Sequence, residues 1–194
     1  MSANLSFVQS FLIGGLLNMS EYEILKVLQV VLEDSSIQAF VGRLVFSKRK
    51  RIWIAGNGGS ASTAIHFASD LMNLGYDVTC MDENISRITA ITNDYSWEEV
   101  YRRQMESFKL GDVLIVISVH GGITYHGSVW SSNLFSACKY AKEKQGLVMA
   151  LLGGDGGAIK KEADVSIVVP HEKAWVVEGI HCVLSHLICE MLTK

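Results

Sequence analysis

The chain has 194 residues, a formal net charge of −3 at neutral pH and 49% hydrophobic residues, which predicts one globular domain with its own core. Its single proline, Pro170, argues against a disordered chain and against two domains divided by a linker. The charge gives no general attraction to nucleic acid or to anionic lipid, so we expect neither as a partner.

The cysteines and the start of the chain bear on where the protein works. Cys80, Cys138, Cys182 and Cys189 form no CxxC pair, and three of them lie in apolar surroundings. We therefore expect reduced residues of a cytosolic protein. The first residues lack the basic stretch of a signal peptide, and the apolar runs are interrupted short of a membrane span. These features favour a cytoplasmic location without membrane association.

Residues 5 to about 47 show helical periodicity without strand alternation. The pattern predicts an N-terminal helical arm, residues 1–50, in two segments, with Ser20 and Glu23 as a capping-box start of the second. The apolar stripe of that second segment consists of Leu25, Leu28, Val31 and Leu32. One small sheet cannot cover so apolar an arm, so we expect it to pack against another copy of the chain.

From Arg51 onward, short apolar runs alternate with helical segments, which predicts an α/β domain over residues 51–194. The expected strands are 51–56, 76–80, 113–118, 147–152 and 165–169, and the expected helices are 60–73, 97–108, about 128–144, 155–163 and about 174–192. Strands that are apolar on both faces and alternate with helices indicate a doubly wound five-stranded parallel sheet. Ligands of such sheets bind at the carboxyl ends of the strands.

A run of basic residues, Lys48-Arg49-Lys50-Arg51, joins the arm to the first strand. It is compatible with a nucleic-acid patch or with the solvated end of a helix, where cations meet the negative pole of the dipole. Because no aromatic or basic residue elsewhere extends the patch, we interpret the run as a helix end.

Two turns rich in glycine follow the first and third expected strands: Gly56-Asn-Gly-Gly-Ser60 and Ser118-Val-His-Gly-Gly-Ile-Thr124. Glycine lets a backbone approach a ligand closely, and the helix that starts at the first turn offers free N–H groups and a positive dipole end. Each turn alone is also explained as a tight connection. Because both would lie at the same edge of the sheet, the pair predicts an anion site, with the phosphate of a small molecule as the ligand.

Ionisable residues lie on the first and last helices of the α/β domain. His66 and Asp70 are four residues apart and share a helix face, which fits either a His–Asp hydrogen bond or half of a divalent-metal site. The closing helix carries Glu178, His181 and His186. About 12 Å of rise and about 80° of rotation separate Glu178 from His186, so one helix can hardly aim both at one ion. If both serve one site, they come from two copies, which predicts an active site at a subunit interface.

The chain resembles the sugar isomerase (SIS) domain family and, within it, the phosphoheptose isomerases. The matching segments run in the family's order from residue 51 onward and include Gly56–Asp70, Ile91–Tyr95, Gly111–Ser118, Gly153–Gly157, Asp164–Pro170 and Ile180–Glu190. The resemblance implies a flavodoxin-like fold, assembly into homotetramers through the helical arms, and conversion of sedoheptulose 7-phosphate into a heptose phosphate for bacterial lipopolysaccharide or capsule.

The resemblance and the two turns together assign expected roles to particular residues. Contacts with the sugar phosphate are expected at Asn57, Gly58, Ser60, Asp94, Ser118, His120 and Thr124. The resemblance implies a zinc or other divalent-metal site at His66, Asp70, Glu178 and His186. It also implies that Asp70 and His186 are the acid/base pair that moves a proton between adjacent carbons of the sugar.

The chain departs from the family pattern at four places. Asp70 stands where Glu is usual, Glu178 where Gln is usual and Leu74 where Arg is usual, and the turn after Ser118 has lost three hydroxyls. Two classes of function therefore stay open. The first is a metal-assisted phosphosugar isomerase. The second is a non-catalytic SIS module that binds a phosphosugar or a protein for regulation, as does a tetrameric relative that binds the bacterial replication initiator.

Overall fold

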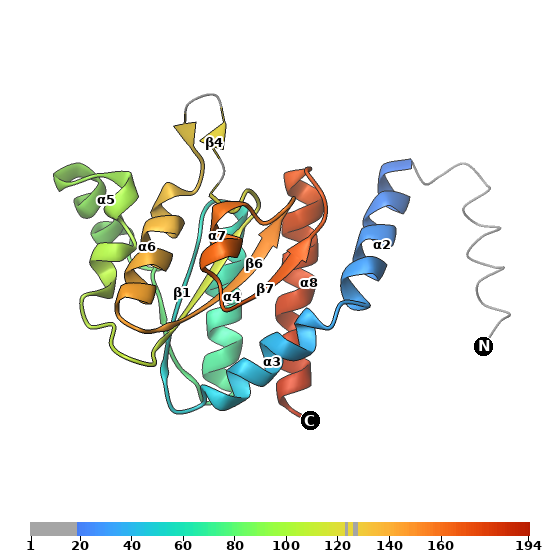
Figure 1. Ribbon diagram of the computed structural model, residues 1–194, viewed down its shortest axis with the longest axis horizontal. Coiled ribbons are helices and arrows are strands. Elements are labelled where there is room, and N and C mark those ends of the chain that lie inside the picture. Colours follow the sequence, from blue (N-terminus) through green and yellow to red (C-terminus); the bar gives the residue numbers. More distant parts are fainter. Residues whose placement is uncertain (1–18, 123, 126–127) are drawn as a thin grey trace, which may run out of the picture.

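The computed structural model describes residues 19–122, 124–125 and 128–194 (Figure 1). Its strands are β1 (Arg51–Gly56), β2 (Asp77–Cys80), β3 (Val113–Ser118), β4 (Thr124–Tyr125), β5 (Ser128–Val129), β6 (Leu147–Gly153) and β7 (Val165–Val169). Its α-helices are α2 (Met19–Leu32), α3 (Ser36–Phe46), α4 (Gly59–Asn73), α5 (Ile85–Asp94), α6 (Ser132–Glu143), α7 (Gly157–Glu162) and α8 (Ala174–Leu192).

Five parallel strands form the main sheet, in the order β2-β1-β3-β6-β7. The chain passes from β1 to β2 on one side and then returns to β3 on the other, so the strand order reverses between β1 and β3. In this register Gly56, the last residue of β1, pairs with Ile117 near the end of β3. The two glycine-rich turns therefore leave the sheet side by side at its topological switch point, where doubly wound sheets bind ligands. The predicted fold class is confirmed.

Helices cover both faces of the sheet, as Figure 1 shows. Ile52 and Ile54 of β1 pack with α3, α4 and α8 in one core, whereas Trp53 and Ala55 pack with α6 and α7 in the other. Successive side chains of a strand point to opposite faces, so a strand covered on both sides must be apolar throughout. This is why β1 is a continuous apolar run rather than an alternating one.

Helix α4 presents two different faces to the rest of the molecule. Its buried stripe is spaced i, i+3, i+4, i+7 and consists of Ala64, Phe67, Ala68 and Leu71, all fully buried. This is the spacing of an amphipathic helix laid on a sheet, and burying Phe67 or Leu71 contributes about 1.5–3 kcal/mol each. The same packing leaves His66 and Asp70 on the flank of α4 that faces α8.

The two described N-terminal helices pack against the α/β domain. Helix α3 buries Ile37, Phe40 and Leu44 in the same core as α4 and α8. Helix α2 contacts β7 and α8, and its Glu23 carboxylate pairs with His171 at 3.1 Å and with Lys173 at 2.8 Å. Of the predicted apolar stripe, Val31 is buried, whereas Leu25 and Leu32 are exposed. The first segment of the predicted arm lies outside the described residues, and a domain boundary at residue 50 stays a prediction.

Three segments differ from the sequence-based expectations. The helix expected at 97–108 is instead two short 3₁₀ pieces, η1 (Trp97–Glu99) and η2 (Arg102–Met105), which bring the bulky Tyr101 and Met105 into the core. Helix α5 was not expected, and the side chain of Asn84 caps it by accepting a hydrogen bond from the Arg87 N–H at 3.0 Å. Helix α6 begins at 132 rather than 128, because 128–129 pair with 124–125 as a short hairpin.

Helix α8 is the one described helix long and apolar enough, by length and composition, to cross a membrane. Its inward residues fill the core beneath the sheet and include Val176, Val177, Ile180, Leu184 and Ile188, all buried. The core helix of a globular domain passes the same test of length and hydropathy as a membrane span.

Candidate active site

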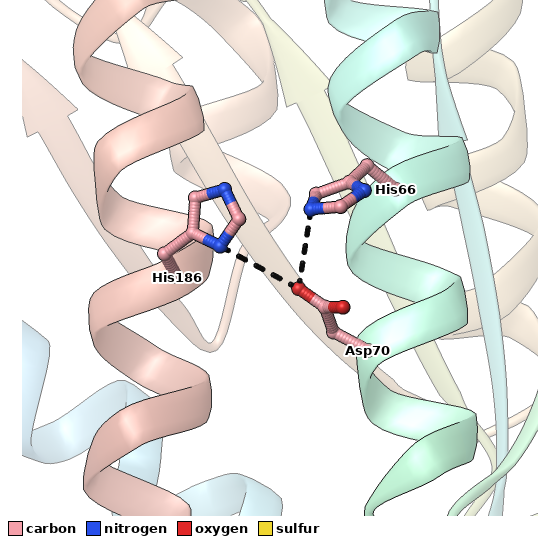
Figure 2. A group of neighbouring side chains, drawn as sticks. All are labelled: His66, Asp70 and His186. Atoms are coloured by element: carbon pink, nitrogen blue, oxygen red, sulfur yellow. Dashed lines mark ion pairs between the residues drawn. The ribbon is translucent and has the colours of Figure 1, made fainter.

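Three ionisable side chains from α4 and α8 converge on one point of the surface (Figure 2). Oδ2 of Asp70 lies 3.4 Å from Nε2 of His66 and 3.6 Å from Nδ1 of His186. The centroids of the two imidazole rings are 4.8 Å apart. Asp70 thus places one carboxylate oxygen between two histidines, and both histidine side chains are more than half exposed. A ligand can reach the group from solvent.

The parallel packing of α4 and α8 creates this group. The carboxylate of Glu178 lies against Gly59 at the start of α4, and His186 meets Asp70 about two turns further along α8 and about three turns further along α4. The helices therefore run in the same direction, and the groups on their facing flanks come together in order. His66 joins because it lies one turn before Asp70 on the same flank.

The spacing of the three groups fits a divalent cation better than a hydrogen-bonded pair. At 3.4 and 3.6 Å, both contacts with Asp70 are longer than a normal N–H···O hydrogen bond. Ligands of a tetrahedral zinc ion with bonds of about 2.0–2.1 Å lie about 3.4 Å apart. One ligand atom from each side chain can be chosen so that all three lie within 4.8 Å of one another. Two imidazoles and a carboxylate suit zinc and related metals.

Glu178 does not join this group within one chain. It sits beside the start of α4, where a Cβ on Gly59 would lie 2.5 Å from its Cδ and 2.6 Å from each carboxylate oxygen. Only a glycine at position 59 therefore lets the carboxylate approach so closely. This placement agrees with the helical rise between Glu178 and His186, which separates the two residues along one helix.

A partly buried carboxylate, Asp82, holds the first turn. Its Oδ1 accepts a hydrogen bond from the Tyr101 hydroxyl at 2.6 Å, and its Oδ2 accepts one from the Gly56 N–H at 2.9 Å. The Tyr101 hydroxyl also contacts the Gly56 carbonyl. Burial raises the pKa of Asp82 to about 6, and the hydrogen bonds from Tyr101 and Gly56 oppose that rise. These contacts with the backbone of Gly56 fix the position of the end of β1.

An amide pair fixes the next residue of the turn. The side chains of Asn57 and Asn133 donate to each other, at 2.9 Å in both directions. Asn133 is fully buried near the start of α6, and its Oδ1 also accepts the Leu134 N–H at 2.9 Å. Because both polar ends of the Asn57 side chain are engaged, Asn57 orders the turn and has little capacity left to bind a ligand.

The second turn is held in a similar way. The Ser118 hydroxyl accepts the Gly121 N–H at 3.0 Å and donates to the Ser131 hydroxyl at 3.1 Å. The Gly121 carbonyl accepts the Ile159 N–H at 2.8 Å, so the turn packs on the start of α7. A Cβ on Gly121 would lie 2.2 Å from the Gly156 carbonyl oxygen, and the Gly121 φ of +60° favours glycine.

His120 lies in the same turn and is partly buried. Its ring meets Trp130 edge-on with centroids 4.3 Å apart. Burial lowers the pKa of His120, and the charges of Glu172 and Glu178 only partly oppose this. At neutral pH the imidazole is therefore uncharged and offers one N–H donor.

The remaining predicted ligand-binding residues are dispersed. Gly58 (φ +57°) and Ser60 lie in the first turn. Asp94 ends α5, is exposed and accepts a hydrogen bond from Asn93 at 2.9 Å; within the described residues no hydrogen bond or ion pair joins it to either turn. The backbone of Thr124 pairs with Val129 in the hairpin, and its side chain lies outside what the structure describes.

Sequence reasoning missed Asp82, Tyr101 and Asn133. A signal for Asp82 was present, because it is a polar residue just after β2, at the carboxyl edge of the sheet where ligand sites gather. Tyr101 and Asn133 carried no comparable signal, since only the tertiary fold brings them to the turn.

Comparisons with known proteins fit this geometry. No family model matches the chain. The phosphoheptose isomerase of Helicobacter pylori is 35% identical over 151 residues, which cover 74% of each chain. The chain belongs to the phosphoheptose isomerase family. It is also 40% identical over 146 residues to the lincomycin biosynthesis protein LmbN of Streptomyces lincolnensis, covering 69% of this chain and 52% of that protein.

The family relationship extends to the three-dimensional fold. The structure of phosphoheptose isomerase GmhA from Neisseria gonorrhoeae superposes with a TM-score of 0.79 and 28% identity, over 96% of this chain and 98% of that one. The resemblance to phosphoheptose isomerases drawn from the sequence motifs is confirmed.

Proposed function

We propose that this chain is a phosphosugar aldose–ketose isomerase that acts on sedoheptulose 7-phosphate or a related sugar phosphate. The observation that carries the proposal is the Asp70 carboxylate held between His66 and His186 on an accessible surface, in a chain that belongs to the phosphoheptose isomerase family. An aldose–ketose exchange requires groups that can hold and release a proton at two neighbouring carbons and their oxygens, and this arrangement provides them.

In the proposed reaction Asp70 and His186 move protons in opposite directions. The Asp70 carboxylate takes the proton from C1 of the ketose while His186 donates one to the C2 oxygen, which gives an enediol. The O1 hydroxyl then returns a proton to His186, and the protonated Asp70 delivers its proton to C2. The aldose forms and both residues recover their starting protonation states.

Three side chains of this chain, His66, Asp70 and His186, would hold the divalent metal, with zinc as the leading candidate. When bound, the metal polarises the carbonyl and hydroxyl oxygens of the sugar and stabilises the negative charge that develops on them. We propose that Glu178 of a second copy completes the ligand set, because Glu178 of the same chain lies against Gly59.

The surface around the group supports assembly of several copies. Ile65 and Met72 on α4 and Val183 on α8 flank the three ionisable residues and are exposed. Exposed apolar side chains gathered on one face are typical of a protein interface. We therefore propose a homo-oligomer with active sites at subunit interfaces, a tetramer in keeping with the resemblance. We also propose a cytoplasmic location.

The phosphate of the substrate is assigned to the turn that follows β3. Gly121 and Gly122 have φ of +60° and +79°, a backbone that can approach an anion closely. The neutral imidazole of His120 can donate one hydrogen bond in place of a hydroxyl. Since Ser118 is already engaged with Gly121 and Ser131, we expect backbone N–H groups and His120 to supply most of the phosphate contacts.

Turnover on a panel of ketose phosphates tests this proposal. The purified protein is incubated with sedoheptulose 7-phosphate, with added zinc and after removal of metal by a chelator, and the aldose product is measured. Metal-dependent aldose formation supports the proposal. Complete inactivity on every ketose phosphate contradicts it, and thermal stabilisation by a sugar phosphate without turnover would instead support a regulatory binding module.

A further inference from the structure

A cavity of about 340 Å³ lies at the edge of the sheet opposite the two glycine-rich turns. It opens where β1, β2 and β3 begin, whereas the two glycine-rich turns lie where β1 and β3 end. Its charged lining comes from three separate segments: Arg49, Lys50, Arg51, Asp77, Lys109 and Asp112. The hydroxyl-bearing Ser107 completes it.

The lining carries more positive than negative charge. It holds four cationic and two carboxylate side chains, a surplus of two positive charges. Arg51 pairs with Asp77 at 3.0 Å, and the buried Asp112 accepts the backbone N–H of Lys109 at 3.1 Å. In the described part of the chain, no ion pair reaches the side chain of Arg49, Lys50 or Lys109.

Lys50 lines the cavity and also packs against the loop before β3. Its Nζ lies 2.9 Å from where a Cβ on Gly111 would be, so the ammonium group packs against the bare Cα of that glycine. Gly111 belongs to the loop before β3, and its φ is +81°. The segment before β1 and the segment before β3 thus bring their cations to the same hollow.

This arrangement changes the interpretation of the basic run at 48–51. Lys48 does behave as a structural residue: its Nζ lies 3.8 Å from the centroid of the Tyr76 ring and donates to the Leu74 carbonyl. The other cations instead face a cavity that Lys109 extends from a distant part of the sequence. Arg49, Lys50, Arg51 and Lys109 are all exposed. Cations gathered around one hollow nevertheless repel one another, and a bound anion would offset that repulsion.

We propose that this cavity is a second ligand site, which binds the phosphoryl or diphosphoryl group of a small molecule. A phosphoryl group carries about −1.5 to −2 charges at neutral pH, which matches the surplus of two positive charges. The volume falls within the range of small-molecule pockets, and Arg with Lys is the usual donor set for phosphate. No aromatic side chain lines the cavity for stacking against a base, which argues against single-stranded nucleic acid.

Isothermal titration with inorganic pyrophosphate tests this site, and it requires no isomerase activity. The unmodified protein is expected to bind pyrophosphate, more weakly as salt is raised. Lys50→Gln and Lys109→Gln should each weaken the affinity about tenfold or more, because each removes one charge-assisted contact. Lys161→Gln removes the same charge from an exposed position on α7 and should leave the affinity unchanged. Circular dichroism and thermal melting establish that the variants fold.

Three outcomes overturn the proposal. The first is an absence of pyrophosphate binding by the folded, unmodified protein. The second is binding that Lys50→Gln and Lys109→Gln leave intact, which would place the anion at the glycine-rich turns instead. The third is tighter binding of a short single-stranded DNA than of pyrophosphate, with the same sensitivity to both variants. None of these outcomes bears on turnover of sedoheptulose 7-phosphate, so the two proposals fail independently.

Discussion

Oδ2 of Asp70 lies 3.6 Å from Nδ1 of His186, although Asp70 belongs to the helix after β1 and His186 to the helix after β7. The parallel packing of α4 and α8 makes this contact, and it places the carboxylate within 3.4 Å of His66 as well. A chain that brings three ionisable groups to an exposed point between two helices must stabilise them with a ligand, with protons or with water.

Metal content is the first prediction. The purified protein should contain close to one zinc or other divalent ion per chain, measured by plasma mass spectrometry. His66→Ala removes one ligand and should lower the affinity more than about 100-fold, since loss of even an outer-shell partner costs about 10–100-fold. His171→Ala removes a histidine that pairs with Glu23 on α2 and should keep the ion. Equal metal in both variants would count against the site.

The second prediction concerns Asp82 and pH. Its pKa in the folded protein is raised to about 6 by burial, whereas the unfolded value is about 3.9. Between these values the folded state binds more protons than the unfolded state, so the contribution of Asp82 to stability is lost as pH rises from about 4 to about 6. The free energy of unfolding relative to Asp82→Asn should therefore fall across that window and level off above it.

Urea unfolding of the protein and of Asp82→Asn at a series of pH values measures this difference. Tyr101→Phe extends the test. It removes the hydrogen bond that holds the pKa of Asp82 down, so the window should move to higher pH, and it should cost about 1–3 kcal/mol of stability. A difference that does not depend on pH, or one that grows with pH, would show that the pKa of Asp82 is not raised in the folded protein.

The third prediction contrasts two glycines. A Cβ on Gly56 would lie 2.4 Å from the Ser60 carbonyl oxygen and 2.8 Å from the Ala61 nitrogen. Because both are backbone atoms, Gly56→Ala should distort the first turn and cost about 2–4 kcal/mol. Gly42 lies in helix α3 with nothing within 4 Å of its Cβ position, so Gly42→Ala should stabilise by about 0.5–1 kcal/mol. Thermal unfolding measures both, and equal effects would contradict the steric argument.

The fourth prediction concerns the proposed assembly. Val183 is exposed on α8 beside His186. Val183→Glu should therefore shift the protein to a smaller oligomer in light scattering, because a buried interface does not accept an unpaired charge. Leu110→Glu places the same charge on an exposed leucine before β3 and should leave the assembly intact. An oligomer that survives Val183→Glu would place the interface elsewhere.

The sheet could be predicted from the sequence because burial on both faces leaves a local signature. All six residues of β3, Val113–Ser118, are buried, so the strand stands out as an apolar run. Helix α5 could not be predicted in the same way. Ile91 is the one buried residue of α5, and Ile88 is partly buried. Two inward-facing apolar residues are too few to show a helical period in the sequence.

The site could be predicted only as far as single elements allow. The i, i+4 spacing already placed His66 and Asp70 on one face of a helix, and the rise of α8 already separated Glu178 from His186. Which turn of α8 meets Asp70 depends on how the two helices pack, which no local pattern specifies. The link between Asp82 and Tyr101 escaped prediction for the same reason.

The most direct test of the central claim follows the proton itself. Sedoheptulose 7-phosphate is incubated with the metal-loaded protein in deuterium oxide, and carbon-bound deuterium in substrate and product is measured by nuclear magnetic resonance. If the Asp70 carboxylate carries the proton between C1 and C2 and exchanges it with solvent before delivery, deuterium should enter at those carbons, and Asp70→Asn should abolish both exchange and isomerisation. Exchange or isomerisation that survives in Asp70→Asn would contradict the assignment of Asp70 as the proton carrier.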